Sequence, residues 1–469
     1  MTSGWVWVNF YLMKPMRYFI INFGCQMNVR DAERMEGILR ERGLSCAERI
    51  EDADLILVNT CTVREKPERK ALSQLGRLCE MKKNRRELLI GICGCVSQQY
   101  QDSLLARFPE LDFVLGTSQV AHLGEVLDMV ISGKRVCRTE WITAEESEIL
   151  FRTSLKEPVN SVSKFVTIME GCDNYCAYCV VPYVRGREFS RKPEDIIAEI
   201  TSLAEQGVKE VVLLGQNVNS YGLKNGFGLD FPGLLKQLAK IDGIERIRFT
   251  TNHPKDLSER LIEVMAQEDK ICEQIHLPLQ AGSDKILQLM GRFYTKSHYL
   301  DLIRKLRNAM PEIGISTDLI VGFPGETEDD FIQTLEMVQE IQFDEAFTFR
   351  YCHRPMTRSA SLPDQVPEPL KLERLYRLNA IVSHITERKN QEQVGKIKEI
   401  LIEGESKTDP EKLTGRTREG RLVHIPGKNA RDLKGKLVLV KIEEGLKHSL
   451  LGELLEETNW QGEKQCLLR

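Results

Sequence analysis

The sequence lacks the segments that take a protein into or across a membrane. No apolar run reaches the roughly 18–20 residues that a membrane helix needs. The opening stretch, Met1–Met13, is aromatic and apolar, but it has neither the basic start nor the small-residue cleavage site of a signal peptide. We therefore expect a cytoplasmic protein without membrane contacts, and we interpret residues 1–15 as an extension ahead of the first folded domain.

A strong excess of one charge is also missing. The formal net charge is −4 over 469 residues, which by itself does not indicate a nucleic-acid-binding protein. The charge is uneven, however, because the stretch Lys412–Lys441 holds nine Lys and Arg residues against two acidic ones. Local excess matters more than total charge for binding a polyanion. This stretch is therefore a candidate RNA-binding surface.

Cysteine is plentiful, with 13 residues, but the export signal that would accompany disulfides is absent. In a reducing cytosol, clustered cysteines indicate metal or redox sites. The strongest cluster is the CxxxCxxC triplet Cys172, Cys176 and Cys179. Three thiolates in so short a loop can bind three irons of a [4Fe–4S] cluster and leave the fourth iron open for a small ligand. A zinc loop that shares a distant fourth ligand is the alternative.

The first part of the chain alternates predicted strands with predicted helices. The strands are at 17–23, 55–58, 88–93 and 113–115, and the helices are at 30–42, 66–83, after 98 and at 120–131. Such alternation predicts an α/β domain with an open parallel sheet covered on both faces.

Three further cysteines each follow one of these strands: Cys25, Cys61 and Cys95. Because the carboxyl ends of parallel strands meet at one edge of a sheet, we expect them to lie together. The helices that follow point their N-termini at this edge, which favours thiolates and an anionic cluster. A buried core residue is the alternative for each cysteine alone. Cys93 would point the same way as Cys95 on an extended strand, so strand geometry does not choose between them.

The second part predicts a partial (βα)6 barrel and a small C-terminal β-barrel. Six strands alternate with helices such as 193–205 and 328–341, which places a site at the strands' carboxyl ends: 164–169, 210–214, 246–250, 274–277, 314–321 and 345–350. A charged helix at 368–393 leads to short strands at 398–403, 421–425, 437–442 and 449–454. The predicted domains are 16–145, 163–394 and 395–457, with a linker at 146–162 and a tail at 458–469.

Together these motifs resemble the methylthiotransferase family of radical SAM enzymes, in its tRNA-modifying branch. Matching stretches run through almost the whole chain after Met16: Phe23–Asn28, Asn59–Lys66, Gly94–Cys95, Ile168–Cys172, Cys179–Gly186, Leu214–Asn219 and Val321–Thr327. The C-terminal stretch Leu413–Thr417 resembles the TRAM domain, an RNA-binding β-barrel.

The resemblance implies an enzyme that adds a methylthio group to C2 of an N6-isopentenyl-type adenosine at position 37 of tRNA. It implies two [4Fe–4S] clusters. The CxxxCxxC cluster would bind S-adenosylmethionine, which serves as radical source and methyl donor, and an auxiliary cluster would supply sulfur. The auxiliary ligands would be Cys25, Cys61 and Cys95, because the family motif selects Cys95 over Cys93.

The resemblance also assigns the S-adenosylmethionine pocket. Gly215, Gln216 and Asn217 follow the second barrel strand and would meet the methionine part of the cosubstrate. Gly322 and Gly325 follow the fifth strand and would lie against the adenine, since glycine permits close backbone approach. An ordinary strand-to-helix turn is the alternative for each segment. Beyond the cluster ligands, we expect no side chain to act as an obligatory general base.

The implied partners are the tRNA anticodon stem-loop and a flavodoxin- or ferredoxin-like electron donor, and we expect a monomer. Basic side chains in two segments are candidates for phosphate contacts, with a solvated surface as the alternative: Arg64, Lys66, Arg69, Lys70, Arg185, Arg187, Arg191 and Lys192. Arg185, Arg187, Arg191 and Lys192 are also candidates for the carboxylate of S-adenosylmethionine. Six other cysteines are interpreted as structural or incidental: Cys46, Cys79, Cys137, Cys272, Cys352 and Cys466.

Two features leave alternatives open. The branch carries Arg-Pro-Gly-Thr after the sixth barrel strand, where this chain has Met356 in place of the glycine. Methionine does not adopt positive φ without strain, so we expect this loop near the substrate mouth to differ. Threonylcarbamoyl-adenosine in tRNA and a ribosomal-protein aspartate are the alternative substrates, and a non-catalytic iron–sulfur or zinc protein that binds RNA is the alternative from another class.

Overall fold

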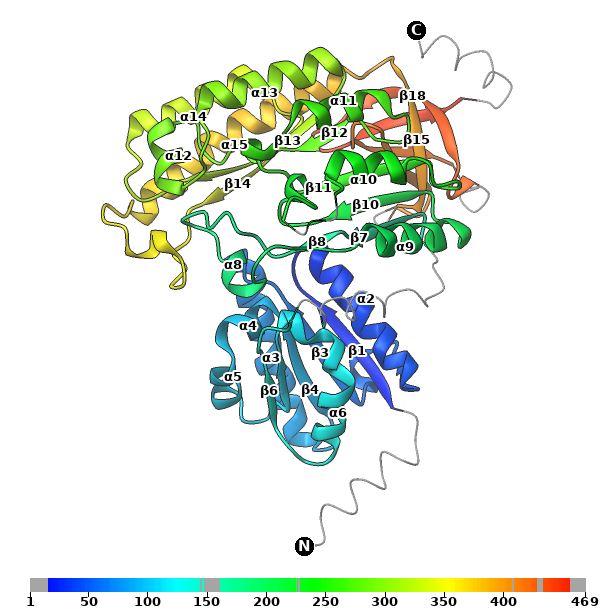
Figure 1. The fold of residues 1–469 in the computed structure, drawn as a ribbon, viewed down its shortest axis with the longest axis vertical. Coiled ribbons are helices and arrows are strands. Elements are labelled where there is room, and N and C mark those ends of the chain that lie inside the picture. Colours follow the sequence, from blue (N-terminus) through cyan, green and yellow to red (C-terminus); the bar gives the residue numbers. More distant parts are fainter. Residues whose placement is uncertain are drawn as a thin grey trace, which may run out of the picture.

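The computed structural model describes residues 16–143, 146, 161–224, 226, 228–406, 409–427 and 433–455. An α/β domain lies below a partial barrel in Figure 1, and a small β-barrel lies beside the partial barrel. The predicted extension, most of the predicted linker and the predicted tail, which contains Cys466, fall outside the described residues. Within the described ranges, no helix is long and apolar enough to cross a membrane.

The N-terminal domain is a six-stranded parallel sheet in the order β2-β1-β3-β4-β5-β6. Its strands are β1 (Arg17–Asn22), β2 (Ser45–Cys46), β3 (Leu55–Thr60), β4 (Leu89–Gly94), β5 (Phe113–Leu115) and β6 (Val136–Arg138). Its helices are α2 (Gln26–Glu41), α3 (Glu65–Asn84), α4 (Cys95–Tyr100), α5 (Asp102–Arg107) and α6 (Leu123–Ile131), with 3-10 turns η1 (Ile50–Asp52) and η2 (Thr117–His122). Every residue of β3 and β4 is buried, which confirms the predicted two-sided sheet.

Two apolar cores cover the faces of this sheet. Helices α2 and α6 pack on one face, around Met35, Leu39 and Leu123. Helix α3 packs on the other face through Leu75 and Leu78. Two helices begin earlier than predicted, α2 directly after Cys25 and α4 at Cys95. Strands β2 and β6 were not predicted, because two or three residues at a sheet edge carry too little alternation to recognise.

The six predicted barrel strands are all present, in two parallel three-stranded sheets ordered β7-β10-β11 and β12-β13-β14. The strands are β7 (Ser163–Thr167), β10 (Glu210–Leu214), β11 (Arg246–Thr250), β12 (Gln274–His276), β13 (Gly314–Val321) and β14 (Glu345–Arg350), with a small antiparallel pair β8 (Met169–Glu170) and β9 (Phe189–Ser190). The helices are α8 (Val181–Val184), α9 (Pro193–Glu205), α10 (Phe231–Leu238), α11 (Glu259–Gln267), α12 (Asp284–Met290), α13 (Lys296–Ala309), α14 (Glu328–Ile341) and α15 (Glu368–Gln391), with 3-10 turns η3 (Val218–Ser220), η4 (Pro254–Asp256) and η5 (Arg358–Ser361).

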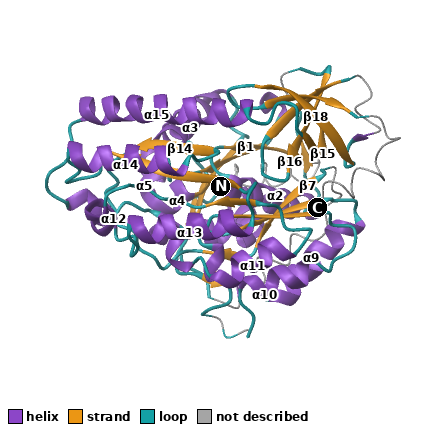
Figure 2. Cartoon of the chain, turned by 90° about the horizontal axis from the view of Figure 1, so that it is seen from above, coloured by secondary structure: helices purple, strands orange, loops and turns teal. Residues whose placement is uncertain are grey.

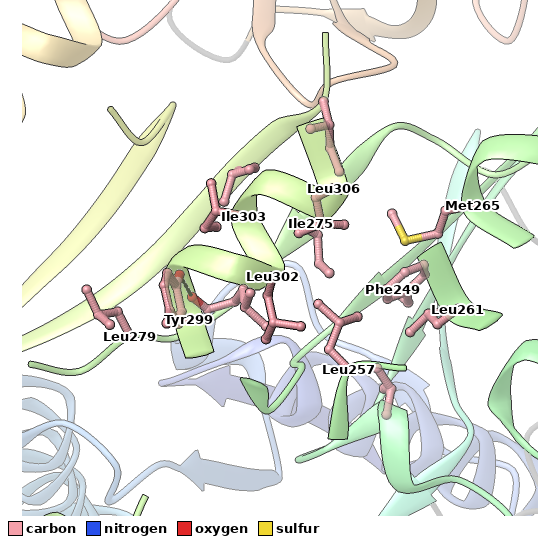
Figure 3. Close-up of a cluster of buried hydrophobic side chains, with 14 of the residues drawn as sticks. Phe249, Leu257, Leu261, Met265, Ile275, Leu279, Tyr299, Leu302, Ile303 and Leu306 are labelled. Carbon is pink, nitrogen blue, oxygen red and sulfur yellow. Dashed lines mark hydrogen bonds between the residues drawn. The ribbon is translucent and has the colours of Figure 1, made fainter. Parts of the chain in front are cut away.

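Apolar packing joins the two barrel sheets where hydrogen bonding is sparse. A parallel bridge between Ile247 and Ile271 links β11 to the residues just before β12. Helices α11 and α13 cover this joint, and Figure 3 shows Phe249 and Ile275 from the two strands in one cluster with Leu302 of α13. Burying such a side chain contributes about 1.5–3 kcal/mol, so this cluster holds the two sheets as one partial barrel.

The C-terminal segment is a closed five-stranded barrel in the order β15-β16-β17-β19-β18. Its strands are β15 (Ile397–Glu405), β16 (Lys412–Thr417), β17 (Leu422–Pro426), β18 (Leu437–Gly445) and β19 (Leu450–Leu454). The predicted small β-barrel is therefore confirmed, with β16 as a strand that we did not predict. Gly415 lies in the middle of β16, and a central glycine weakens a strand pattern.

The turn between β16 and β17 docks this barrel onto the partial barrel, and Figure 2 shows β16 and β15 close to β7 when the molecule is viewed from above. Arg418 in the turn donates to the Glu273 carboxylate at 2.7 and 2.9 Å. In return, the buried Arg246 and Arg248 of β11 donate to backbone oxygens of β15, β16 and the turn, at 2.6 to 2.9 Å. The C-terminal barrel is therefore fixed to the central one by paired charges.

Candidate active site at two cysteine triplets

The structure brings together the three cysteines that are dispersed in sequence. Cys25, Cys61 and Cys95 follow β1, β3 and β4 and lie at the same edge of the sheet. The Cys25 and Cys61 thiols hydrogen-bond each other, which holds the pKa of Cys25 below its ordinary value and raises that of Cys61. Burial, together with the nearby Cys25 thiolate, raises the pKa of Cys95, although the Arg185 guanidinium opposes this. We call these three residues the dispersed triplet.

Gly94 separates Cys95 from Cys93. Its φ of +89° turns the chain at the end of β4, and a Cβ there would lie 2.5 Å from the Thr60 carbonyl oxygen. Cys93 is consequently part of the apolar core beneath α2 and α6, fully buried beside Phe113 and Leu115. Cys95 begins α4 and faces the other two thiols. The turn at Gly94 therefore distinguishes Cys95 from Cys93, a choice that the geometry of an extended strand left open.

The dispersed triplet suits a cluster better than a single ion. Among the described residues, no three His, Cys, Asp or Glu side chains are placed to hold one metal ion. In a [4Fe–4S] cluster each thiolate binds a different iron, so the three sulfurs need not converge on one point. The buried Nη1 atom of Arg185, beside Cys95, has no hydrogen-bond partner in the described part of the chain. A cluster with anionic sulfurs would satisfy this donor, so the residues present fit the group.

The CxxxCxxC loop lies between β8 and α8, at the mouth of the partial barrel (Figure 1). Gly171 has a φ of +74°, and a Cβ there would lie 2.0 Å from the Arg187 carbonyl oxygen. Backbone hydrogen bonds tie Cys172 to Gly186 and Ala177 to Met290, at 3.2 and 2.8 Å. The loop is therefore held in shape by its own backbone and by the start of the turn after α12.

The thiols of this loop are close enough to act on one another. Burial and the neighbouring Cys176 raise the pKa of Cys172 to about 11, and the same causes raise the pKa of Cys179. Arg292, itself buried, donates to the Cys176 sulfur at 3.4 Å and to the Pro278 carbonyl at 3.0 Å. A cationic donor beside buried thiols favours their anionic form. The three cysteines and Arg292 thus fit an iron–sulfur cluster.

Buried polar atoms without partners gather at the ends of β10, β11 and β12. Among the described residues, six such atoms belong to Gln216, Asn217, Asn219, Asn252, His253 and Gln280. They lie next to the CxxxCxxC loop, because the His253 ring packs edge-on against Tyr294, 5.7 Å between centroids, and Tyr294 accepts from Arg292. Buried polar groups in native proteins are normally satisfied, so these atoms are placed to hydrogen-bond a polar ligand.

Sequence reasoning identified only part of this pocket. Gln216 and Asn217 were predicted, and Gly215 lies beside them with its Cα side against Met169. His253 and Gln280 were missed, although each follows a barrel strand and the same strand-end argument would have found them. Burial, with Arg292 and Lys255 nearby, lowers the pKa of His253, so the imidazole is neutral. Its Nδ1 accepts from the Lys255 amide, so Nε2, unpartnered among the described residues, carries the proton and is a donor.

Gly322 and Gly325 form a tight turn after β13. Both have positive φ, +72° and +82°. The Gly322 amide donates to the Glu326 carboxylate at 2.7 Å, and the Gly325 amide donates to the Asp364 carbonyl at 3.0 Å. These donors are occupied within the protein, which favours the turn interpretation of the two glycines. Their predicted contact with adenine stays a prediction.

Several predicted phosphate contacts are wrong, because the side chains are buried in ion pairs. Arg185 donates to Asp31 at 2.6 Å, and Arg191 pairs with Glu199 at 2.7 Å, both at the interface with the N-terminal domain. In the basic C-terminal stretch, Arg418 is committed to Glu273 in the partial barrel. For Arg185 and Arg418 the sequence could not reveal this, because their partners lie more than 100 residues away.

Other basic side chains are not buried. Arg187 is exposed and pairs with Asp173 at 2.6 Å, beside the CxxxCxxC loop. On α3, Arg69 is exposed and pairs with Glu65, and Arg64 lies over the Phe349 ring of β14, 5.9 Å from its centroid. These side chains remain candidates for RNA contacts.

Met356 does not strain its loop. It is absent from the residues with positive φ in the described chain, so the methionine adopts an ordinary backbone conformation. The neighbouring Arg354 is buried and pairs with Glu68 on α3, which also accepts from Thr62 and Tyr100 at 3.0 and 2.8 Å. The backbone at Met356 therefore avoids the conformation that favours glycine, whereas the predicted difference from the family's loop stays a prediction. The loop after β14 is anchored to the N-terminal domain.

Family models match three parts of the chain. The Radical SAM superfamily matches residues 166–338, the Uncharacterized protein family UPF0004 matches residues 17–116, and the TRAM domain matches residues 391–455. A solved structure of the radical S-adenosylmethionine methyltransferase TsrM from Kitasatospora setae, with cobalamin and a [4Fe–4S] cluster bound, is similar in fold. Its TM-score is 0.52 at 15% identity, and the similarity covers 74% of both chains. A CxxxCxxC loop at the mouth of such a barrel defines a radical SAM enzyme, which uses S-adenosylmethionine and an iron–sulfur cluster.

Comparison with curated relatives identifies the family within the radical SAM enzymes. The chain is 48% identical over 441 residues to a tRNA-2-methylthio-N(6)-dimethylallyladenosine synthase of Syntrophus aciditrophicus, covering 94% of both chains. It is 47% identical over 449 residues to the synthase of the same name from Syntrophomonas wolfei, covering 95% of this chain and 99% of that one. The chain belongs to the tRNA-2-methylthio-N(6)-dimethylallyladenosine synthase family.

Proposed function

We propose that this chain is a tRNA methylthiotransferase that adds a methylthio group to C2 of an N6-isopentenyl-type adenosine in the anticodon stem-loop. The observation that carries the proposal is the joining of two cysteine triplets by one short helix. Helix α8 follows the CxxxCxxC loop, and its Val184, with Val180 just before it, packs against Cys95 of the dispersed triplet. A radical formed at one site and sulfur held at the other would then meet over one substrate.

We further propose that Cys172, Cys176 and Cys179 hold the cluster that binds S-adenosylmethionine, and that the dispersed triplet holds a second one. The bound cofactors supply the radical, the sulfur and the methyl group, since C2–H of adenine offers no easy acid–base route. The chain's own residues orient the reacting groups and shield them from water. Val180 and Val184 exclude water between the triplets, and no side chain is assigned as an obligatory general base.

The pocket at the ends of β10, β11 and β12 is proposed to orient S-adenosylmethionine. Gln216, Asn217 and Gln280 offer oxygens to an ammonium group, and Arg292 lies where it would oppose a carboxylate or a thiolate. The neutral His253 can hydrogen-bond without adding charge. Gly322 and Gly325 would bring the backbone of the turn after β13 close to the adenine.

The TRAM-like barrel and the exposed basic side chains of α3 are proposed to bind the tRNA backbone. Electrons would come from a small flavodoxin- or ferredoxin-like protein. A cytoplasmic monomer, with the domain boundaries predicted from the sequence, completes the proposal.

The proposal is tested with protein reconstituted anaerobically with iron and sulfide. Dithionite, S-adenosylmethionine and tRNA carrying isopentenyl-adenosine should yield the methylthiolated nucleoside, measured by mass spectrometry of the digested tRNA. Cys172→Ala should abolish both 5′-deoxyadenosine and product. Cys61→Ala should still release 5′-deoxyadenosine but form no product, because only the radical site remains.

Three other results would redirect the assignment. Methylthiolation of tRNA carrying threonylcarbamoyl-adenosine, or of a ribosomal-protein aspartate, with isopentenyl-adenosine left unchanged, would replace the substrate. Zinc in place of iron at the CxxxCxxC loop, with no cleavage of S-adenosylmethionine, would indicate a non-catalytic RNA-binding protein.

A further inference from the structure

Arg185 belongs to the radical SAM domain, and its side chain extends to the dispersed triplet in the N-terminal domain. It follows α8 directly, and its side chain is 4% exposed. One Nη2–H donates to the Asp31 carboxylate of α2 at 2.6 Å. Val184, the residue before it, packs against Cys95, and the positive charge of Arg185 acts to lower the pKa of the Cys95 thiol. The arginine therefore lies beside a proposed ligand of one cluster, while its own chain segment carries the ligands of the other.

One N–H donor of the Arg185 guanidinium is not used within the described part of the protein. Its Nη1 atom is buried and has no hydrogen-bond partner among the described residues. An unsatisfied buried donor on a charged group is costly, because the group has lost its hydrogen bonds to water. Such a cost is offset where a ligand accepts the hydrogen bond, and the sulfurs of an iron–sulfur cluster are acceptors of this kind.

The neighbouring arginines of this interface are placed differently. Arg191 pairs with Glu199 and donates to the Thr167 carbonyl at 2.6 Å, and Arg34 pairs with Glu170 at 3.0 Å. Arg185 differs from them because its charge lowers the pKa of Cys25 and of Cys95. Holding the two domains together does not require that interaction, since the Arg34–Glu170 and Arg30–Glu199 pairs already do so.

We propose that Arg185 is a hydrogen-bond donor to the auxiliary cluster, supplied by the radical SAM domain, and that it stabilises the reduced form of that cluster. This inference rests on the proposed function, because it requires a cluster on Cys25, Cys61 and Cys95. One-electron reduction adds one negative charge to the cluster, and Arg185 remains protonated throughout. A buried cation and an N–H···S bond both favour the more negative form, and so raise the reduction potential.

Replacing Asp31 tests the sign of the expected change in the reduction potential of the cluster. The Asp31 carboxylate lies beside the same guanidinium, and its charge acts on Cys95 in the opposite direction. Arg185→Met removes the donor and the positive charge, so the auxiliary cluster should become harder to reduce. Asp31→Asn breaks the same ion pair but removes a negative charge, so the cluster should become easier to reduce. A purely structural ion pair predicts the same direction for both.

The experiment uses the full chain with Cys172, Cys176 and Cys179 replaced by alanine, so that only the auxiliary cluster is reconstituted. Its midpoint potential is measured by dithionite titration followed by electron paramagnetic resonance, together with iron content. Arg191→Met is the matched control, since it removes another buried arginine of the same interface, and its potential should stay at that of the parent. Arg185→Lys keeps the charge and should lie between the parent and Arg185→Met.

Each outcome decides a different question. Opposite shifts for Arg185→Met and Asp31→Asn support the inference, as does loss of cluster loading in Arg185→Met when Arg185→Lys and Asp31→Asn still load. An unchanged potential in Arg185→Met, a shift of the same sign in Asp31→Asn, an equal shift in Arg191→Met, or loss of loading in all Arg185 and Asp31 variants overturns it. A parent protein that takes up no iron refutes the auxiliary cluster itself, and with it the proposed function.

Discussion

At the scale of single residues, the conformation of one glycine and the pairing of two buried arginines shape the site. Gly94 turns the chain so that Cys95 and Cys93, two positions apart, face different surroundings. Arg185 and Arg292 each bring a buried positive charge to one cysteine triplet. Thiolates and cluster sulfurs are anionic, and a low-dielectric interior makes a nearby cation more effective than it would be in water.

Replacing Cys95 should remove one cluster, and replacing Cys93 should not. Cys95→Ala deletes a thiol that faces Cys25 and Cys61, so iron and sulfide content should fall by one cluster. Cys93→Ala deletes a core sulfur and should lower stability while the reconstituted iron content stays at the wild-type value. Iron analysis and thermal unfolding of both variants check this. The reverse pattern would show that Cys93 is the ligand.

Arg292→Met should slow the reductive cleavage of S-adenosylmethionine. The variant loses a donor to Cys176 and to the Pro278 carbonyl. A hydrogen bond to a charged group contributes about 1.5–3 kcal/mol, which corresponds to roughly 10- to 100-fold in rate. Formation of 5′-deoxyadenosine per cluster is the measurement. Tyr294→Phe, which removes only a neighbouring hydroxyl, is the control and should change the rate less. A wild-type rate in Arg292→Met with full iron content would contradict the assignment.

At the scale of elements, hydrogen bonds at the starts of helices fix neighbouring helices of the partial barrel to one another. Helix α14 begins with a reciprocal cap, in which Thr327 accepts from the Asp330 amide and the Asp330 carboxylate accepts from the Thr327 amide. Asp330 also accepts from Ser283 and Lys285 at the start of α12, at 2.6 and 2.8 Å. One carboxylate thus caps its own helix and ties it to a neighbour.

Thr327→Ala should destabilise the protein by about 1 kcal/mol, the usual contribution of a helix N-cap. Thr327→Ser keeps the hydroxyl and serves as the control. Urea unfolding of both variants beside the wild type measures the difference. Equal midpoints for Thr327→Ala and the wild type would show that the cap contributes nothing here.

The contribution of Asp330 should depend on pH. Burial would raise the pKa of this carboxyl, but hydrogen bonds from Lys285, Ser283 and Thr327 outweigh it and lower the pKa. A depressed folded-state pKa contributes stability above the unfolded value, about 3.9, and this stability is lost as the pH falls below it. The difference in unfolding free energy between the wild type and Asp330→Asn should therefore shrink below about pH 4. A difference that stays constant from pH 6 downward would contradict this.

At the scale of the whole molecule, charged pairs between domains set how the three parts meet. The N-terminal domain is held through Asp31 and Glu199 at one side and through Glu68 at the other. The C-terminal barrel is held by Arg418 in its β16–β17 turn and by Arg246 from the partial barrel. The two cysteine triplets and the C-terminal barrel are therefore parts of one arrangement.

Arg418→Ala should loosen the C-terminal barrel from the partial barrel. The pair with Glu273 is bidentate, but its arginine is 24% exposed, so its loss should cost about 1–2 kcal/mol. Hydrogen exchange in the β16–β17 turn should rise, and tRNA binding should weaken. Arg416→Ala is the matched control, because Arg416 pairs with Glu403 inside the same barrel. Equal exchange in the two variants would remove the docking role of Arg418.

The sequence alone determined the order of elements, the three-part architecture and both cysteine triplets. Strand and helix patterns are local, so β10, β11, β13 and β14 begin and end where they were predicted. The CxxxCxxC motif is also local, since eight residues contain all three thiols. The dispersed triplet was predicted from a topological rule, because parallel strands end at one edge, and the family resemblance selected Cys95 over Cys93.

Only the tertiary structure decided what the charged residues do and which surfaces meet. Arg185 and Arg191 read as surface basic residues in the sequence, yet both are buried in ion pairs, Arg185 with Asp31 of the N-terminal domain and Arg191 with Glu199 of its own domain. The strand-end rule could place His253 and Gln280 at the same edge, but only the structure shows that each has a buried polar atom without a partner among the described residues. Desolvation and pairing depend on groups that lie far apart along the chain, and a sequence pattern contains neither of them. The contact between α8 and Cys95, which brings the two triplets together, exists only once both domains have folded and packed.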